Sequence, residues 1–226
     1  MTDSTPDPAA PATSEATRWL ALGAVAGPAL FTLAWFVLGF LSPGITIFGT
    51  LIAPYSPISQ PISGLGLGST AAFMNTAFVL SGILLMAGVI GVFQTPTIRA
   101  SSRSAARWAC AALLALSPLG LVVAGICTLE EPLPHLIGFL LATGTPVLSF
   151  LAAGFFLRGI PPWRRFGTWL LLGSPLTLVL VVLFFLTFDQ AATVAGQGVA
   201  GLTQRILALE VLAWFAAMGW LALRRP

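Results

Sequence analysis

Six long apolar stretches, separated by short and more polar connections, dominate the hydrophobic pattern of the chain. Each is about as long as the roughly 20 residues that a helix needs to cross the hydrocarbon core of a bilayer. They lie near residues 19–41, 71–93, 107–128, 135–157, 166–188 and 203–223. The pattern predicts an all-α fold, in which residues 19–223 form a single integral membrane bundle of six transmembrane helices.

Short polar segments flank this domain. Residues 1–18 are rich in Pro, Ala, Ser and Thr and have no periodic apolar face, so we expect a disordered tail. Residues 224–226 form a short end after the sixth span. A signal peptide is not favoured, because the first apolar stretch exceeds the about 7–15 residues of a signal core and no Ala-x-Ala site follows it.

The connections alternate in charge, and this alternation predicts the orientation. All ten basic residues are Arg, and nine of them flank the spans on one side. These nine are Arg18, Arg99, Arg103, Arg107, Arg158, Arg164, Arg165, Arg224 and Arg225. By the positive-inside rule this side is cytoplasmic, so both termini are cytoplasmic and the connections 42–70, 129–134 and 189–202 face outward. We expect a multi-pass protein of the plasma membrane.

Tryptophans near the arginine side are typical of the aromatic belt at a membrane interface. The five concerned are Trp19, Trp108, Trp163, Trp169 and Trp220. Four prolines lie inside spans, where each removes a backbone hydrogen bond and should kink its helix. They are Pro28, Pro118, Pro146 and Pro175. Gly23 and Gly27 have the four-residue spacing that lets two helices approach closely.

Composition excludes a water-soluble domain. With 57% hydrophobic and 8% charged residues, the chain has too little polar surface for a soluble protein of 226 residues. The net charge of +3 resides in clusters that membrane orientation already explains, so nucleic acid is not an expected partner. Membrane lipids are the expected partners, and a membrane protein or a small ligand is left open. The sequence does not indicate an oligomeric state.

Polar side chains that membrane spans rarely contain gather on the predicted outer side. Glu210 follows Arg205 by five residues, which is about 7.5 Å along a helix and about 140° around it, so the two do not stack on one face. An uncompensated ionisable group in a span costs about 2–3 kcal/mol, which marks Glu210 as a candidate functional residue. We expect an outward-facing pocket lined by Ser63, Asn75, His135, Arg205 and Glu210, with Tyr55, Gln60, Glu130, Glu131 and Asp189 as secondary candidates.

The sequence leaves two possible roles open for each of Arg205 and His135. Arg205 either pairs with one of the three outer carboxylates or binds an anion such as a lipid phosphate. His135 is the sole histidine, and it is either a hydrogen-bonded structural residue or a base. A zinc site needs three or four ligands, and no HExxH or CxxC spacing occurs, so neither a metal nor a cofactor is expected.

The string Ile62-Ser63-Gly64-Leu65-Gly66, followed by Asn75 and by residues 79–82, carries a family resemblance. With His135 at the head of span four and residues 201–205 at the entry to span six, the chain resembles bacterial multi-pass membrane proteins catalogued as domain of unknown function 998. The resemblance spans roughly residues 19–223 and implies no activity, substrate or partner. Gly64 stands where many relatives are expected to have an acidic residue, which argues against an acid-dependent role for this turn.

Three functions from different classes fit these observations. The first is a bundle whose outward polar pocket binds a lipid head group or small ligand, or which acts as a membrane scaffold. The alternatives are an intramembrane lipid hydrolase that uses His135 and carboxylates, and a small proton-coupled transporter that uses Glu210. A distant likeness to membrane hydrolases with several metal-binding histidines transfers no ligand, because His135 stands alone. The inner halves of the spans have almost no ionisable residues, so we favour binding over transport.

Overall fold

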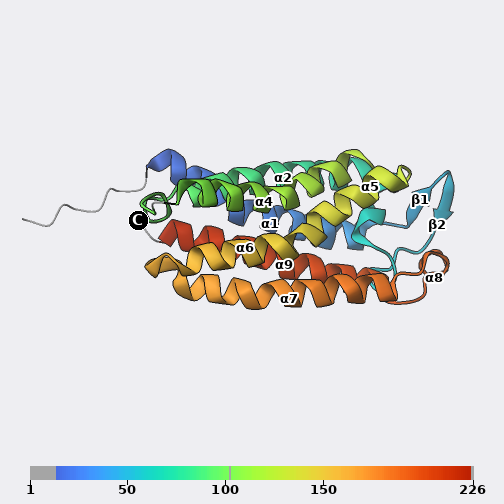
Figure 1. Ribbon diagram of the computed structural model, residues 1–226. Helices are drawn as coiled ribbons and strands as arrows, with labels where there is room; N and C mark the ends of the chain where they lie inside the picture. The colour runs from blue at the N-terminus through green and yellow to red at the C-terminus, as the bar shows by residue number, and fades with distance from the viewer. Residues whose placement is uncertain (1–13, 102, 225–226) are drawn as a thin grey trace, which may run out of the picture.

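Six long helices form an elongated bundle in the computed structural model, which describes residues 14–101 and 103–224 (Figure 1). The all-α prediction is confirmed, since six helical segments of the described chain are long and apolar enough to cross a membrane. Five of them are α1 (Glu15–Leu41), α2 (Ala71–Phe93), α4 (Ser104–Ile126), α7 (Arg164–Thr187) and α9 (Ala200–Arg224). The sixth joins α5 (Pro132–Phe139), η3 (Leu140–Gly144) and α6 (Thr145–Arg158).

Short elements occupy the two ends of the bundle. One end, called here the loop end, has the antiparallel hairpin β1 (Ile45–Ile47) and β2 (Thr50–Ile52) with η1 (Ile62–Gly66), η2 (Gly68–Thr70) and α8 (Gln190–Val194). The other, called the arginine-rich end, has α3 (Pro96–Arg99) and η4 (Pro161–Trp163). There α1 begins and α9 ends, so both ends of the described chain lie on one side of the bundle (Figure 1).

The first helix begins earlier than the sequence pattern predicts. The Ser14 side chain accepts a hydrogen bond from the backbone N–H of Thr17 (3.2 Å) and so caps the helix before Glu15. Residues 15–18 of the predicted tail are therefore helical. Residues 1–13 of that tail, and residues 225–226 of the predicted C-terminal end, lie outside the described residues.

Close packing of α1 on α2 organises the bundle. A Cβ added at Gly23 would lie 2.1 Å from the Leu84 carbonyl oxygen, and one at Gly27 would lie 2.8 Å from that of Ser81. The predicted small-residue contact is therefore present, with α2 as its partner. Because α2 also packs on α4, it is the most buried span, with 56% of its apolar stretch inside the protein against 28% for α7.

The prolines affect the helices unequally. The helical backbone continues through Pro28, Pro118 and Pro175. Before Pro146 the chain widens into the π-turn η3. Pro146 has no N–H to donate to the carbonyl of Ala142, four residues earlier, and the hydroxyl of Ser117 donates to this carbonyl instead (2.7 Å). The neighbouring helix thus completes the hydrogen bonding of the bent span, as a membrane interior requires.

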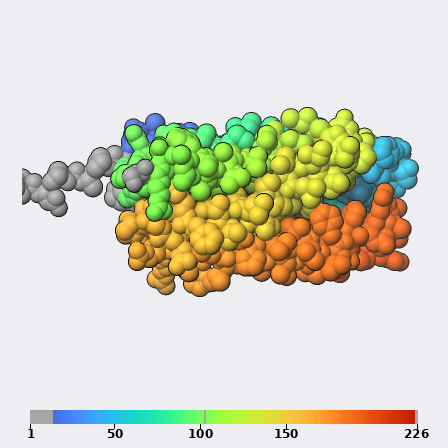
Figure 2. All heavy atoms as spheres, viewed as in Figure 1, coloured from blue at the N-terminus to red at the C-terminus, as the bar shows by residue number. Residues whose placement is uncertain are grey.

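Large apolar side chains cover the outside of the bundle, as expected for a surface in contact with lipid. Phe40 is 78% exposed and Leu186 is 79% exposed. The face shown in Figure 2 is a continuous cover of side chains from α4, α5, α6 and α7. Four of the five predicted belt tryptophans are exposed, but Trp163 is fully buried and its indole N–H donates to the Thr97 hydroxyl (3.2 Å). Trp163 therefore lies at the predicted end of the bundle but does not face the membrane interface, because its ring is packed inside the protein.

Candidate functional site

The connection between β2 and η2 folds into the loop end of the bundle. Every residue from 59 to 67 is buried, although the sequence contains three prolines between residues 54 and 61 and no charge. Residues 55–67 are called the plug below. The plug contacts α9 through its backbone, since the Leu202 N–H donates to the Ile58 carbonyl (2.9 Å) and the Ile62 N–H to the Gln204 side chain (2.6 Å).

Arg205 holds the plug against α9. One guanidinium nitrogen, Nη1, donates to the carbonyls of Pro57 (2.7 Å), Gln60 (3.0 Å) and Gly201 (2.9 Å). The other terminal nitrogen, Nη2, donates to the Tyr55 hydroxyl. Among the described residues, Arg205 therefore bonds to neutral groups. Of its two predicted roles, pairing with Asp189, Glu130 or Glu131 is not what the structure shows, and anion binding stays a prediction.

Aromatic rings complete the surroundings of the guanidinium group. Its central carbon lies 5.4 Å from the ring centroid of Trp35 on α1 and 5.9 Å from that of Tyr55. Burial raises the pKa of Tyr55 above its ordinary value, and the neighbouring Arg205 charge opposes part of this shift. The phenol is therefore a neutral hydrogen-bond acceptor at physiological pH.

Ser63 and Asn75 belong to the other side of the plug. Ser63 is buried within η1. The Asn75 amide, in the first turns of α2, donates to the Gly66 carbonyl (3.0 Å) and lies directly over Gly66. Asn75 thus fastens the plug to α2 as Arg205 fastens it to α9. The sequence motif that contains Gly66 has a structural role in this contact.

His135 has a different hydrogen-bond partner from the Arg205 cluster. Its Nδ1 is 2.7 Å from the Cys127 carbonyl, so the imidazole joins the start of α5 to the end of α4. Partial desolvation and then the nearby Glu131 carboxylate raise the pKa of the Cys127 thiol, which makes it a weaker nucleophile. Among the described residues, no group of three or more His, Cys, Asp and Glu side chains is placed to hold a metal ion.

The remaining outer carboxylates stabilise loops. Glu130 accepts a hydrogen bond from the Phe48 N–H (2.8 Å) at the β1–β2 turn, where Phe48 has a φ of +48°. Asp189 caps α8 by accepting from the Ala192 N–H (2.9 Å). Both carboxylates are exposed. These hydrogen bonds indicate that both carboxylates stabilise the loops in which they lie.

Glu210 lies deeper than the sequence suggests. Because α9 begins at Ala200, Glu210 lies about 15 Å along the helix from its loop end, close to its midpoint. Its carboxylate accepts from the Thr177 hydroxyl on α7 (3.0 and 3.1 Å) and from the indole N–H of Trp214 (2.6 Å). The structure thus joins Tyr55, Gln60 and Arg205, whereas Glu210 and His135 have separate partners.

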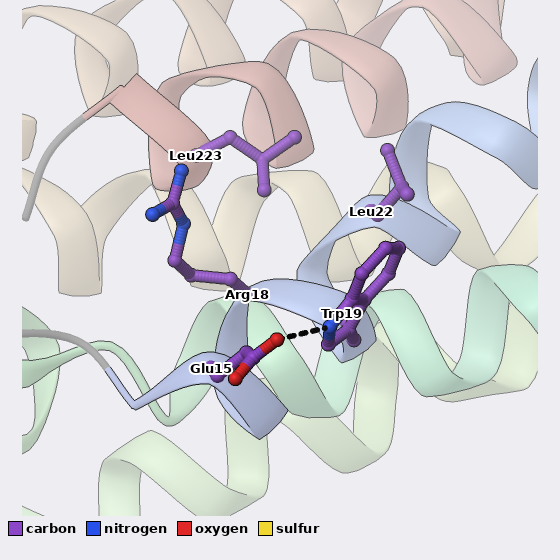
Figure 3. A pocket seen from close by; sticks show the side chains of 5 residues that line it. All are labelled: Glu15, Arg18, Trp19, Leu22 and Leu223. Atoms are coloured by element: carbon purple, nitrogen blue, oxygen red, sulfur yellow. Dashed lines mark hydrogen bonds between the residues drawn. The ribbon is translucent and has the colours of Figure 1, made fainter.

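A hollow at the arginine-rich end was not anticipated from the sequence. It has a volume of about 460 Å³ and lies between the first turns of α1 and the last turn of α9. Figure 3 shows the Arg18 side chain directed toward Leu223, while the Glu15 carboxylate lies beside the Trp19 indole on the other side. The Trp19 N–H donates to Glu15 (3.3 Å). The lining residues are Glu15, Arg18, Trp19, Leu22 and Leu223.

Comparison with known proteins adds a family to this geometry. A family model described as Protein of unknown function (DUF998) matches residues 25–221, which is most of the chain. The chain belongs to this family. No curated protein and no solved structure matches the chain at a significant level. In this DUF998 protein the plug, Arg205 and Glu210 lie inside the matched stretch, and the five residues that line the hollow lie outside it.

Proposed function

We propose that this multi-pass membrane protein of the DUF998 family binds the head group of a zwitterionic phospholipid in the hollow at its arginine-rich end. The observation that carries the proposal is the combination of a cavity of about 460 Å³ with a guanidinium group and a carboxylate, which both come from the first turn of α1 and point in different directions. Cavities of about 300–1,000 Å³ are typical of small-molecule sites. A phosphate with an attached ammonium group has the matching pair of charges.

The lining residues suit the parts of such a lipid in turn. Arg18 provides the planar set of donors that binds a phosphate with two hydrogen bonds. Glu15 and the face of Trp19 suit an ammonium group, through charge and cation–π attraction. Leu22 and Leu223 supply an apolar wall for the glycerol and the first methylene groups. All five residues lie at an end of the spans, which is the depth of lipid head groups.

The uneven distribution of arginines between the two ends of the bundle indicates on which side of the membrane this lipid lies. Eight described arginines flank the spans at the same end as the hollow, and Arg205 lies at the other. We therefore propose that the protein lies in the plasma membrane with its arginine-rich end and both termini on the cytoplasmic side. The lipid would then belong to the cytoplasmic leaflet. The eight are Arg18, Arg99, Arg103, Arg107, Arg158, Arg164, Arg165 and Arg224.

The other functions considered from the sequence have less support. A hydrolase needs His135 beside carboxylates, whereas the hydrogen bond described for its imidazole goes to a backbone carbonyl and not to a carboxylate. A proton-coupled carrier needs a polar route from Glu210, whose described hydrogen bonds end at Thr177 and Trp214. The outward-facing pocket predicted at the loop end stays a prediction. The part of that end around Arg205 is occupied by the plug.

Lipid titration of the delipidated protein, followed by native mass spectrometry, tests the proposal. Phosphatidylethanolamine offers a phosphate and an ammonium group, whereas phosphatidylglycerol offers the phosphate alone. Arg18→Gln should weaken binding of both lipids about fivefold, since an exposed charge-assisted contact contributes about 1 kcal/mol. Glu15→Gln should weaken binding of phosphatidylethanolamine alone.

The matched control is Arg165→Gln, which removes an exposed arginine from the same end of the bundle and does not alter the lining of the hollow. It should bind both lipids as the parent does. Equal affinities for the parent and Arg18→Gln, or an equal loss in Arg165→Gln, would show that the hollow does not select a head group.

A further inference from the structure

Buried donors without protein partners surround Arg205. Among the described residues, no hydrogen bond reaches Nε of Arg205, Nε1 of Trp35, Nε2 of Gln60 or the hydroxyl of Ser59. All four residues are at most 8% exposed. They belong to one neighbourhood, because the Arg205 guanidinium group contacts the Trp35 ring and the Gln60 carbonyl, and Ser59 precedes Gln60. Buried polar groups without partners are rare in folded proteins and indicate a missing ligand or water.

The chemistry of these groups specifies an acceptor. Three of the four are N–H groups that can only donate. The guanidinium charge is met by three carbonyl dipoles, a phenol and two rings, all of them neutral. The cluster thus has a full positive charge with no carboxylate bonded to it in the described chain. A buried cation of this kind favours an anion over water, which also needs acceptors for its own protons.

We propose that this cluster binds one small inorganic anion of about the size of chloride, held by the N–H groups of Arg205, Trp35 and Gln60. The site lies at the loop end and is independent of the phospholipid hollow. Since Trp35 is on α1, Gln60 is in the plug and Arg205 is on α9, the anion joins the plug to two helices.

Thermal unfolding of the purified protein in detergent tests the site. Sodium chloride replaces sodium gluconate step by step at constant ionic strength and pH, so that charge screening does not change. The parent should unfold at a higher temperature in chloride, with a saturable dependence on its concentration. An identical unfolding temperature in the two salts would overturn the proposal and leave water as the partner of the donors.

Two variants tie the response to the cluster. Trp35→Phe keeps an aromatic ring and removes one donor, so the midpoint of the chloride titration should rise about tenfold, which corresponds to about 1.4 kcal/mol. Its matched control is Trp220→Phe, at an exposed position on the arginine-rich end, which should respond as the parent does. A Trp35→Phe midpoint equal to that of the parent would count against the site.

Gln60→Glu keeps the tests informative if Trp35→Phe does not fold. Its carboxylate preserves the acceptor that the Ser56 N–H uses (3.1 Å) and removes the amide donors. It also brings a negative charge to the residue whose backbone carbonyl Arg205 binds. The fixed charge takes the place of the anion. This variant should therefore have the same unfolding temperature in chloride and in gluconate. A chloride response as large as that of the parent would contradict the proposal.

Discussion

Replacing Arg205 with Gln should release the plug from the loop end of the bundle. The substitution removes three hydrogen bonds to carbonyls, at 2.7, 2.9 and 3.0 Å, and the bond to the Tyr55 hydroxyl. A hydrogen bond to a charged group contributes about 1.5–3 kcal/mol, and a glutamine amide can replace one or two of the four. Removing the buried cation also relieves its desolvation, which offsets part of the loss.

The net cost is about 3 kcal/mol by this reasoning, which corresponds to an increase of about 150-fold in the population with an open plug. Ser59 provides the probe, because it is 1% exposed and lies within the plug. Ser59→Cys is introduced after Cys110 and Cys127 are replaced by Ala, and the rate of thiol labelling is measured in the parent and in the Arg205→Gln background. Labelling through local opening follows the open population.

The control for this experiment is Arg165→Gln, at an exposed position on the other end of the bundle, which should leave the labelling rate unchanged. Arg205→Lys keeps the charge but loses the planar fork, so its rate should lie between those of the parent and Arg205→Gln. If the thiol introduced by Ser59→Cys reacts equally slowly in all backgrounds, Arg205 does not hold the plug.

Four other positions offer separate tests. Tyr55 is the only tyrosine, and burial raises its pKa, so tyrosinate absorbance should titrate above pH 10.0 in the folded protein and near pH 10 after denaturation. Folding stability should therefore fall as the pH rises above 10, and it should fall less in Tyr55→Phe. Gly23→Ala should lower the unfolding temperature sharply, because its Cβ would lie 2.1 Å from a backbone oxygen. Gly144→Ala should not, because its Cβ would meet no atom of another part of the protein within 4 Å. Glu210→Leu leaves the Trp214 indole unpaired and should cost about 1–3 kcal/mol in detergent unfolding, more than Glu210→Gln, which keeps the acceptor. Ser101→Cys, introduced after Cys110 and Cys127 are replaced by Ala, should react with an impermeant thiol reagent only after cells are opened, and reaction in intact cells would reverse the proposed orientation.

The sequence was sufficient for the membrane architecture because its signals are local. A stretch of about 20 apolar residues specifies a span by itself, and the six stretches correspond to the six long helices. Gly23 and Gly27 likewise predicted a close helix contact from their spacing alone, and only the identity of the partner, α2, needed the fold.

The candidate site was less predictable because its partners are distant in the chain. A lone outer arginine suggested a carboxylate partner, but the plug brings backbone carbonyls of Pro57 and Gln60 to Arg205, and backbone carbonyls give no sequence signal. The depth of Glu210 was misjudged because α9 starts three residues earlier than the apolar pattern indicates. The hollow has no local sequence signal, because Arg18 and Leu223 line the same space only when the first and last spans pack together.

Analysis of the lipids retained by the protein tests the proposed function most directly. The protein is extracted from its membrane with a polymer that keeps surrounding lipid, exchanged into detergent, and its tightly bound lipids are quantified per protein chain by mass spectrometry. The parent and Arg165→Gln should retain a zwitterionic phospholipid at about one per chain, and Arg18→Gln should retain clearly less of it. A retained mixture that mirrors the bulk membrane, equal in all three proteins, would contradict the head-group site.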